Sequence, residues 1–329
     1  MNILIVKLSS LGDVVQTMPV VTDLQRAFPN SQIDWVVEEA FAPLVTRVVG
    51  VRRVIPVALR RWRRTWLGSK TKQERAAFKA TLQEQAYDAI IDCQGLTKSA
   101  LVARIARLAP SGVRGSFANK SDACGYEWPV KFLLPHNQAM PTRIHAVART
   151  RLLAAKLLGY ENTGAPHSQF KDLPTSSVTS NRIFFAHGTT RPDNEWPQWK
   201  WENLGEALLK QHPYRVLLPH ANAHELAICE GIKRHLGKSA EILPRMGLSE
   251  ILDVMASCKG VIGVDSGLSH MAVALGLPHV QIFSHDRAWR AGPIDTAHQI
   301  AIGGVQAPSS DAALQAWMQV ETAASSSPP

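Results

Sequence analysis

The fold of this chain is decided by residues 261–278, which read VIGVDSGLSHMAVALGLP. Residues 261–264 predict a short buried strand, and the turn Asp265-Ser266-Gly267 leads into an apolar helix that ends at residues 276–278. Free backbone N–H groups at such a helix start attract anions, and glycine lets a phosphate come close. An acid, a hydroxyl and an imidazole occupy the same turn, namely Asp265, Ser269 and His270. The stretch therefore predicts a site for the phosphates of a nucleotide-linked molecule.

Length and composition favour a two-domain globular protein. The chain has 329 residues, of which 45% are apolar and 19% charged, and no apolar run approaches the roughly 20 residues of a membrane-spanning helix. The N-terminus opens in a strand-like segment without the features of a signal peptide, so we expect a cytoplasmic protein. Four cysteines lie far apart and predict reduced, buried thiols. The net charge of +9 favours nucleic acid, anionic lipid or a phosphorylated substrate, without choosing among them.

The first half of the chain alternates strand-like and helix-like segments. Strands are expected at 2–6, 32–37, 53–57, 88–92 and 112–115, with helices at 13–28, 70–86, 96–108 and 143–158. This alternation predicts right-handed crossovers and a parallel sheet covered on both faces. Residues 159–181 break the pattern with Gly, Pro, Ser, Thr and Asn, and we place a linker at 166–181.

The second half restarts the same alternation. Strands are expected at 182–186, 215–218, 240–243, 260–264 and 279–283, with helices at 200–211, 223–236, 249–257, 268–275 and 311–323. The Ser/Pro-rich end of the chain predicts a disordered tail. We therefore expect two doubly wound α/β domains facing a cleft, residues 1–165 and 182–310, with ligands at the carboxyl ends of their strands. Residues 311–329 would supply a C-terminal helix and the tail.

A carboxylate follows the first strand in the run Lys7-Leu8-Ser9-Ser10-Leu11-Gly12-Asp13. An Asp at a helix start is favoured by the helix dipole in any protein, so capping alone would explain Asp13. The alternative is a chemical role at the predicted cleft. The turn lacks the Gly-x-Gly-x-x-Gly spacing of dinucleotide binders, which argues against an NAD site.

In the second half, the strand at 182–186 is followed by two hydroxyls and a cation, Thr189, Thr190 and Arg191. They could bond phosphate oxygens or form an ordinary polar turn. Glu225 follows the next strand and could accept ribose hydroxyls, although exposed helical Glu is common. His220 and His224 are a weak metal pair, and the chain has no Asp-x-Asp motif to hold a nucleotide diphosphate through a metal.

The densest basic cluster is Arg60-Arg61-Trp62-Arg63-Arg64. Guanidinium groups suit planar recognition of phosphates and carboxylates, whereas solvated surface charge is the alternative explanation. No nucleic-acid-binding module accompanies the cluster, so nucleic acid is not the expected partner. Trp62 and Trp66 are expected to pack or to touch lipid headgroups.

Taken together, these motifs resemble the lipopolysaccharide heptosyltransferases, most of all heptosyltransferase I. The resemblance rests on residues 6–14, 34–39, 53–63 and 87–96, on Thr189-Thr190-Arg191 with Trp196-Pro197, and on residues 265–270. It implies a GT-B fold and an inverting, metal-independent enzyme without a resident cofactor. It also implies the donor ADP-L-glycero-β-D-manno-heptose and the acceptor Kdo2-lipid A, whose inner Kdo takes the heptose at the cytoplasmic face of the inner membrane. Membrane contact would be peripheral, and no obligate protein partner is implied.

The resemblance implies a role for each candidate residue. Asp13 would be the general base, in an acceptor-binding domain that also uses Ser10, Gly12, Arg60, Arg61, Arg63, Arg64 and Lys120. In the donor domain, Thr189, Thr190 and the backbone N–H groups of Ser266, Gly267 and Leu268 would hold the diphosphate. Glu225 would bind the ribose, Met246 would lie near the adenine, and Asp265 would bond heptose hydroxyls. Arg191, Asn194 and His270 would complete the donor site.

Two positions depart from the family pattern. Asn194 stands where the family usually has a lysine that meets the donor phosphate, and Arg191 or Lys200 would have to substitute. Residues 284–287, Ser-His-Asp-Arg, replace the family's Gly-Pro-Thr near the donor sugar.

Two other functions fit the same residues. One is transfer of a later heptose or of another sugar, and the second is non-catalytic binding of an anionic glycolipid or nucleic acid through the arginine cluster. The latter predicts salt-dependent binding without turnover of a nucleotide sugar.

Overall fold

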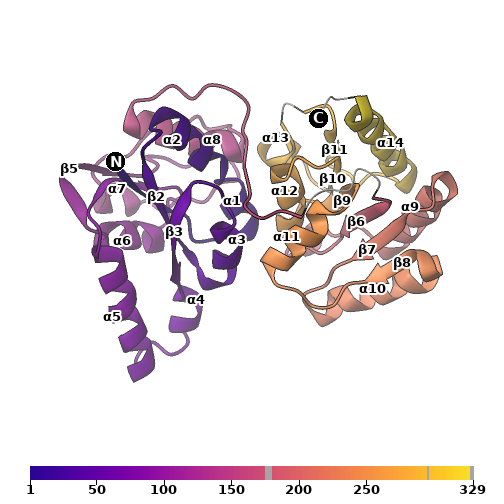
Figure 1. The fold of residues 1–329 in the computed structure, drawn as a ribbon, viewed down its shortest axis with the longest axis horizontal. Coiled ribbons are helices and arrows are strands. Elements are labelled where there is room, and N and C mark those ends of the chain that lie inside the picture. Colours follow the sequence, from indigo (N-terminus) through magenta and orange to yellow (C-terminus); the bar gives the residue numbers. More distant parts are fainter. Residues whose placement is uncertain (175–179, 295, 327–329) are drawn as a thin grey trace. The chain divides into compact units, whose positions relative to one another are not determined.

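The computed structural model describes residues 1–174, 180–294 and 296–326, which form two compact units (Figure 1). Unit 1 comprises Met1–Lys171 and unit 2 comprises Asp172–Pro329. The chain thus passes from one unit to the other within the predicted linker, part of which, residues 175–179, lies outside the described residues.

Unit 1 is built on a five-stranded parallel sheet with the strand order β3-β2-β1-β4-β5. Its strands are β1 (Asn2–Val6), β2 (Gln32–Glu38), β3 (Val51–Val57), β4 (Tyr87–Asp92) and β5 (Leu108–Gly115). Its α-helices are α1 (Leu11–Val15), α2 (Pro19–Ala27), α3 (Ala42–Thr46), α4 (Leu59–Trp62), α5 (Ser69–Gln83), α6 (Thr97–Ile105), α7 (Val130–Leu133) and α8 (Ala146–Leu158), with a 3-10 turn at Glu39–Phe41.

Unit 2 is built on a six-stranded parallel sheet with the strand order β11-β10-β9-β6-β7-β8. Its strands are β6 (Arg182–Ala186), β7 (Arg215–Leu218), β8 (Ala240–Ile242), β9 (Gly260–Val264), β10 (His279–Phe283) and β11 (Gln299–Gly303). Its α-helices are α9 (Gln198–Gln211), α10 (Ala223–Leu236), α11 (Leu248–Ala256), α12 (Gly267–Ala274), α13 (Ala288–Ala291) and α14 (Ser310–Ser326), with 3-10 turns at Pro192–Asn194 and Gly237–Ser239.

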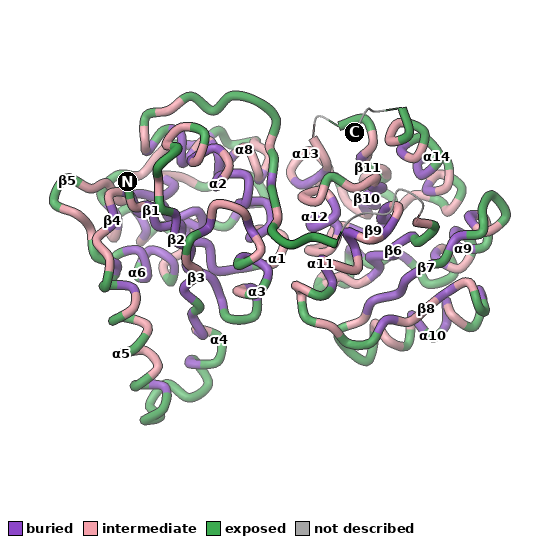
Figure 2. Tube along the Cα trace, in the orientation of Figure 1, coloured by how far each residue is buried: buried purple, intermediate pink, exposed green. Residues whose placement is uncertain are grey.

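Both strand orders are those of doubly wound α/β folds, so the predicted fold class is confirmed. Successive side chains of a strand point to opposite faces, and β9 and β10 are buried along their whole lengths. Both faces of the sheet are therefore covered along these central strands, and Figure 2 shows purple, buried strands in the interior of each unit.

The structure differs from the expected elements in several places. Strand β5 begins at Leu108, where the helix expected at 96–108 would still continue. The helix expected at 13–28 is two helices, α1 and α2, because Pro19 lacks the N–H that would continue the first. Strand β11 was not predicted, because its sequence QIAIG has alternating exposed and half-buried residues at the sheet edge. Helix α14 continues to Ser326, so residues 324–326 of the predicted tail are helical, whereas 327–329 lie outside the described residues.

The four cysteines are all buried and free, as predicted. Burial raises the pKa of the Cys93, Cys229 and Cys258 thiols to about 12, so these thiols stay protonated and unreactive. In the described part of the chain, no helix is both long and apolar enough to cross a membrane.

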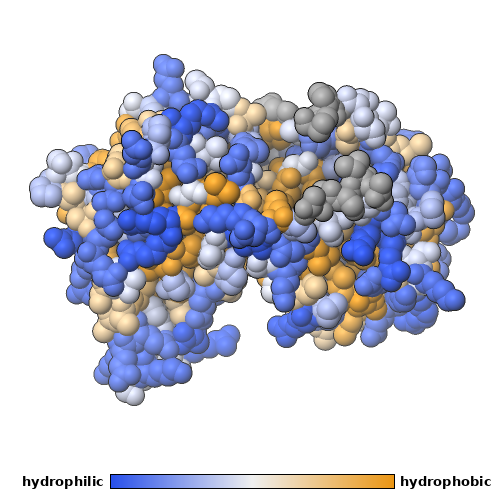
Figure 3. All heavy atoms as spheres, viewed as in Figure 1, coloured by the Kyte–Doolittle hydropathy of each residue, from blue (hydrophilic) through white to orange (hydrophobic). Residues whose placement is uncertain are grey.

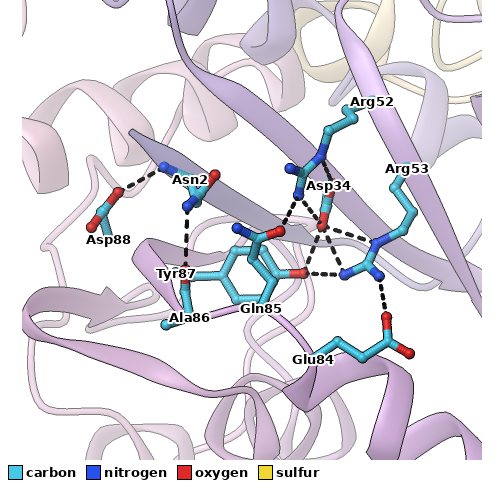
Figure 4. A network of polar contacts seen from close by, with 9 residues as sticks. All are labelled: Asn2, Asp34, Arg52, Arg53, Glu84, Gln85, Ala86, Tyr87 and Asp88. Atoms are coloured by element: carbon cyan, nitrogen blue, oxygen red, sulfur yellow. Dashed lines mark hydrogen bonds and ion pairs between the residues drawn. The ribbon is translucent and has the colours of Figure 1, made fainter.

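A buried carboxylate connects three strands of unit 1 (Figure 4). Asp34 on β2 is fully buried and accepts hydrogen bonds from Arg52 Nε at 2.9 Å, Arg53 Nε at 3.2 Å and Tyr87 Oη at 2.7 Å. Arg53 also pairs with the exposed Glu84. Burial and the bond to Asp34 raise the pKa of Tyr87 to about 12. A buried charge needs such partners, because an unpaired carboxylate would carry a large desolvation cost.

We predict that Asp34→Ala lowers the free energy of unfolding by about 3 kcal/mol, because two arginines and a phenol lose a buried partner. Urea unfolding followed by circular dichroism measures the change. The control is Glu84→Gln, which removes a partner that is 60% exposed and should cost at most about 1 kcal/mol. Equal losses in the two variants would contradict this account of the network.

Candidate functional site

Each sheet has one place where the chain reverses the direction in which it adds strands. In unit 1, β2 and β3 are added on one side of β1, and β4 and β5 on its other side. In unit 2, β7 and β8 are added on one side of β6, and β9, β10 and β11 on its other side. Ligands of doubly wound sheets bind outside the carboxyl ends of such strand pairs. The predicted turns follow these strands, with residues 7–13 after β1 and residues 187–194 and 265–270 after β6 and β9.

Asp13 lies in the first turn of α1, after β1. Its Oδ2 accepts hydrogen bonds from Ser10 Oγ at 2.7 Å and from the Ser10 backbone N–H at 3.1 Å. These bonds form the capping box that explains the residue structurally. Asp13 is nevertheless only half-buried, as is Gly12 beside it. The carboxylate is therefore held in one orientation and still reachable.

The turn before Asp13 is held in place by the end of β4. Gln94 Oε1 accepts hydrogen bonds from the backbone N–H groups of Leu8 at 2.8 Å and Ser9 at 3.3 Å. Lys7 Nζ donates to the Cys93 carbonyl at 3.1 Å. The Asp-Cys-Gln sequence at 92–94 was part of the recognised motif, but its role as the support of this turn could not be predicted from sequence.

Asp92, at the end of β4 and two residues before Gln94, is fully buried. Its Oδ1 accepts from the Gln94 backbone N–H at 3.0 Å and its Oδ2 from Ser116 Oγ at 3.0 Å. Burial raises the pKa of Asp92 to about 6, although these hydrogen bonds oppose the shift. Removal from solvent is therefore the larger of the two effects on this carboxyl group.

The arginine cluster divides into paired and unpaired side chains. Arg61 bonds Glu39 with Nε and Nη2 and bonds Glu74 with Nη1 at 2.7 Å; these bonds raise its pKa. Trp62 is buried and donates its indole N–H to the same Glu74, so the expectation that Trp62 packs is confirmed. Arg63 and Arg64 are exposed and make no side-chain polar contact with any described residue. Arg63 and Arg64 are thus better placed to meet an anionic ligand than Arg61.

Arg60 lies over the ring of Phe41, 5.7 Å from its centroid, close to the buried Glu38 at the end of β2. Burial raises the pKa of Glu38, while the charges of Arg60 and Lys98 oppose this effect. The exposed Lys120 belongs to the segment after β5, and its carbonyl accepts from Asn119 Nδ2. Glu38 and Lys98 were not among the predicted site residues.

In unit 2 the opening motif forms the expected strand, turn and helix. Ser266 caps α12 and its side chain accepts from the Ser269 backbone N–H, so the N–H groups of Gly267 and Leu268 lie in the helix's first turn, where no intrahelical acceptor exists. Ser269 is buried and donates its hydroxyl to the Val264 carbonyl at 2.6 Å. Ser269 therefore stabilises the turn and is not available to a ligand.

Three side chains contact the Asp265 carboxylate. Its Oδ1 lies 3.3 Å from Gln281 Nε2 and 3.5 Å from His270 Nε2, and its Oδ2 lies 3.4 Å from Asn194 Nδ2. Asn194 also donates to the Asp265 carbonyl at 3.2 Å and is 3% exposed. Asn194 thus joins the turn after β6 to the turn after β9. Gln281 was not predicted, because only the register of β10 beside β9 brings it there.

The two cations proposed to replace the family's lysine both have partners elsewhere. Lys200 Nζ donates to the Pro308 carbonyl at 2.8 Å, and Arg191 pairs with Asp193 at 3.2 Å. Thr189 Oγ1 accepts from the Arg191 backbone N–H, and Thr190 is exposed. His285 belongs to the loop at 284–287, whose sequence differs from the family pattern, and its Nε2 lies 3.2 Å from the same Asp193. That loop is therefore connected to the turn after β6.

Glu225 lies in the first turn of α10, where Asn222 caps its backbone N–H at 2.9 Å. Its Oε2 accepts from the Ala221 backbone N–H at 2.7 Å. A Cβ added to Gly188, after β6, would lie 2.9 Å from the Glu225 carboxyl carbon. The absence of a side chain at Gly188 therefore lets Glu225 approach the end of β6. Met246, in the segment after β8, is half-buried.

One buried histidine at this strand end was not predicted. His187 Nε2 lies 3.0 Å from the Pro219 carbonyl and 3.1 Å from Cys229 Sγ, and burial lowers its pKa. It is therefore neutral near pH 7, and its ring also packs edge-on against Trp201. Across residues 1–174, 180–294 and 296–326, no group of three or more His, Cys, Asp or Glu side chains is arranged to hold a metal ion.

Two doubly wound units, each with polar side chains at its switch point, are the architecture of GT-B glycosyltransferases. Comparison with protein families identifies the family of glycosyltransferases: the model of glycosyltransferase family 9 (heptosyltransferase) matches residues 75–314. The chain belongs to this family, and it is a glycosyltransferase.

Relatives are similar over most of the chain. Lipopolysaccharide heptosyltransferase 1 of Escherichia coli K12 is 39% identical over 293 residues, which cover 86% of this chain and 88% of the relative. The protein of the same description from Pseudomonas aeruginosa PAO1 is 36% identical over 289 residues, covering 86% and 78%.

Solved structures agree with the sequence comparison. E. coli heptosyltransferase WaaC with ADP superimposes with a TM-score of 0.85 at 35% identity, covering 97% of this chain and all of that one. WaaC with ADP-2-deoxy-2-fluoro heptose gives 0.78 at 34% identity, covering 99% and 98%. E. coli heptosyltransferase II, at 21% identity and a TM-score of 0.77, shares the fold.

Proposed function

We propose that this enzyme transfers L-glycero-D-manno-heptose from ADP-heptose to the inner Kdo of Kdo2-lipid A in the synthesis of the lipopolysaccharide inner core. The observation that carries the proposal is family membership together with the Asp13–Ser10 pair after β1 and the Asp265 turn after β9. The protein would work in the cytoplasm, in peripheral contact with the inner membrane that holds its acceptor.

The donor would bind at the switch point of unit 2. The first-turn N–H groups of α12 and the hydroxyls of Thr189 and Thr190 would receive the diphosphate, since helix N-termini bind phosphate groups. Glu225, beside Gly188, would accept ribose hydroxyls, and Met246 would lie near the adenine. Asp265, oriented by Asn194, Gln281 and His270, would bond hydroxyls of the heptose.

The reaction would be a displacement at the anomeric carbon with inversion. The acceptor hydroxyl oxygen forms the new bond, its proton passes to the Asp13 carboxylate, and the bond between the anomeric carbon and the phosphate oxygen breaks to release ADP. The first turn of α12 would stabilise the negative charge on the departing phosphate, a task that other glycosyltransferases give to a metal ion. The metal-independent mechanism therefore rests on backbone dipoles.

The acceptor would bind at unit 1, near the turn of Ser10, Gly12 and Asp13. Arg63 and Arg64 carry the free guanidinium groups that suit its phosphates and carboxylates, with Arg60, Arg61 and Lys120 as further contacts. The test is incubation of the purified enzyme with ADP-heptose and Kdo2-lipid A, followed by the mass of the lipid product. A gain of one heptose residue is expected.

An acceptor panel separates the proposal from transfer of a later heptose. Transfer should require Kdo and should stop after a single heptose. Transfer only to an acceptor that already carries heptose would contradict the proposed acceptor. Vesicle or nucleic-acid binding without any release of ADP would favour the non-catalytic alternative.

We predict that Asp13→Ala lowers kcat by about 10²–10⁴-fold, because the acceptor hydroxyl loses its base. Ser10→Ala is the milder variant: the carboxylate loses the hydroxyl that bonds it at 2.7 Å but keeps the Ser10 backbone N–H, so kcat should fall by less than in Asp13→Ala. Steady-state rates of ADP release measure both effects. An Asp13→Ala rate within a few fold of the parent would contradict the assigned base.

We predict that Gly188→Ala raises the KM for ADP-heptose by about 10-fold or more, because the new methyl displaces the Glu225 carboxylate from its proposed ribose contact. Gly304→Ala is the matched control in the same unit, since a Cβ there has no heavy atom within 4 Å. Donor titrations at saturating acceptor compare the two. An unchanged KM in Gly188→Ala would exclude Glu225 from the donor site.

A further inference from the structure

The large exposed apolar side chains of unit 1 include an aromatic pair beside α7. Trp128 is 67% exposed and Phe132 is 68% exposed, with their ring centroids 5.8 Å apart and edge to face. The opposite side of the same short helix is anchored, because Val130 and Leu134 are buried in the unit's core. The two rings are therefore held at the surface by a packed element.

Helix α6, which contacts α7, also carries exposed apolar side chains. Leu101 is 46% exposed and Ile105 is 39% exposed, and residues four apart lie on one helix face. The segment before Trp128 is fixed to the start of α6, since Glu127 Oε2 accepts from the Thr97 backbone N–H at 2.8 Å. Helices α6 and α7 are in contact and appear together in Figure 1. We name the side chains Leu101, Ile105, Trp128, Lys131 and Phe132 the aromatic ridge.

Basic side chains accompany the aromatic ridge. Residues 97–107 and 128–136 contain Lys98, Arg104, Arg107 and Lys131 and no acidic residue. Lys131 Nζ lies 4.9 Å from the Phe132 ring centroid. The adjacent Glu127 has its carboxylate committed to the start of α6. The two segments thus combine exposed rings with an excess of positively charged residues, of which Lys131 lies beside a ring.

We propose that the aromatic ridge docks this enzyme on a bilayer of anionic phospholipids. The proposal rests on the proposed function, which places the acceptor in a membrane. Tryptophan and phenylalanine rings enter the interfacial region, while lysine and arginine reach the negative headgroups. Each basic residue near an anionic surface strengthens binding about fivefold, whereas an uncharged protein partner would not favour this charge.

The other exposed tryptophans of the chain differ from Trp128. Trp66 is 52% exposed, but its ring is covered by the Arg75 guanidinium at 3.7 Å from the ring centroid. Trp66 belongs to the segment between α4 and α5, and around these two helices Figure 3 shows mostly hydrophilic residues. Trp199 in unit 2 is 57% exposed with Lys200 at 5.6 Å, and no aromatic contact among the described residues joins it to a second exposed ring. Trp199 is therefore a matched control.

The experiment is sedimentation of the full-length enzyme with vesicles of phosphatidylcholine containing phosphatidylglycerol, and with vesicles of phosphatidylcholine alone. The parent should bind the anionic vesicles, and the double variant Trp128→Ser/Phe132→Ser should bind them at least about tenfold more weakly. Trp199→Ser should bind like the parent. Lys131→Gln should lose about fivefold on anionic vesicles and nothing on neutral ones.

Two further measurements decide between explanations. Melting temperatures and transfer to a deacylated, water-soluble Kdo acceptor should be unchanged in the double variant, which would show that its site is intact. Unaltered vesicle binding by the double variant, or binding lost through Trp66→Ser instead, would overturn the proposal. So would a dimer of the parent that the double variant dissociates, since the ridge would then be a contact between copies. Vesicle binding as expected, with no heptose transfer by any form, would refute the proposed function and leave the docking surface.

Discussion

The constraint on which this structure depends is that both sheets are parallel and that their central strands are buried on both faces. Side chains within these central strands have no access to a ligand, so chemistry there is confined to the turns at strand ends. The chain supplies those turns with hydrogen-bonded polar groups. Gln94 supports the turn of Asp13 in unit 1, and Asn194 joins the two turns at Asp265 in unit 2. In each unit the site is therefore made by two strands that are neighbours in space and distant in sequence.

The two proposed binding sites offer different groups to an anionic ligand. Unit 1 presents guanidinium groups, of which Arg63 and Arg64 have no polar side-chain partner within the described part of the chain. In unit 2, Lys200 and Arg191 are occupied by the Pro308 carbonyl and by Asp193, and a neutral amide stands at position 194. At the proposed donor site, the positive end of α12 would therefore be the main attraction for phosphate. A bulky, multiply charged acceptor suits the first arrangement, and a single diphosphate suits the second.

The sequence predicted most strands within two residues, because buried parallel strands are short apolar runs bounded by polar turns. It also predicted the residues of the turns, since Asp13 and residues 265–270 carry local motifs. The contacts between those turns could not be predicted. Asn194 and Asp265 are 71 residues apart, and Arg61 meets Glu74 only because α4 and α5 pack together. Edge strand β11 escaped prediction because its pattern is that of a half-exposed segment.

We propose that the base lies in unit 1 and the donor site in unit 2, so mutation should separate their two roles. Calorimetric titration of the full chain with ADP measures this separation in the parent and in the variants Asp13→Ala and Gly188→Ala. Asp13→Ala should bind ADP with the affinity of the parent, whereas Gly188→Ala should bind ADP about tenfold more weakly. Loss of ADP binding in Asp13→Ala, with parental binding in Gly188→Ala, would contradict the proposal.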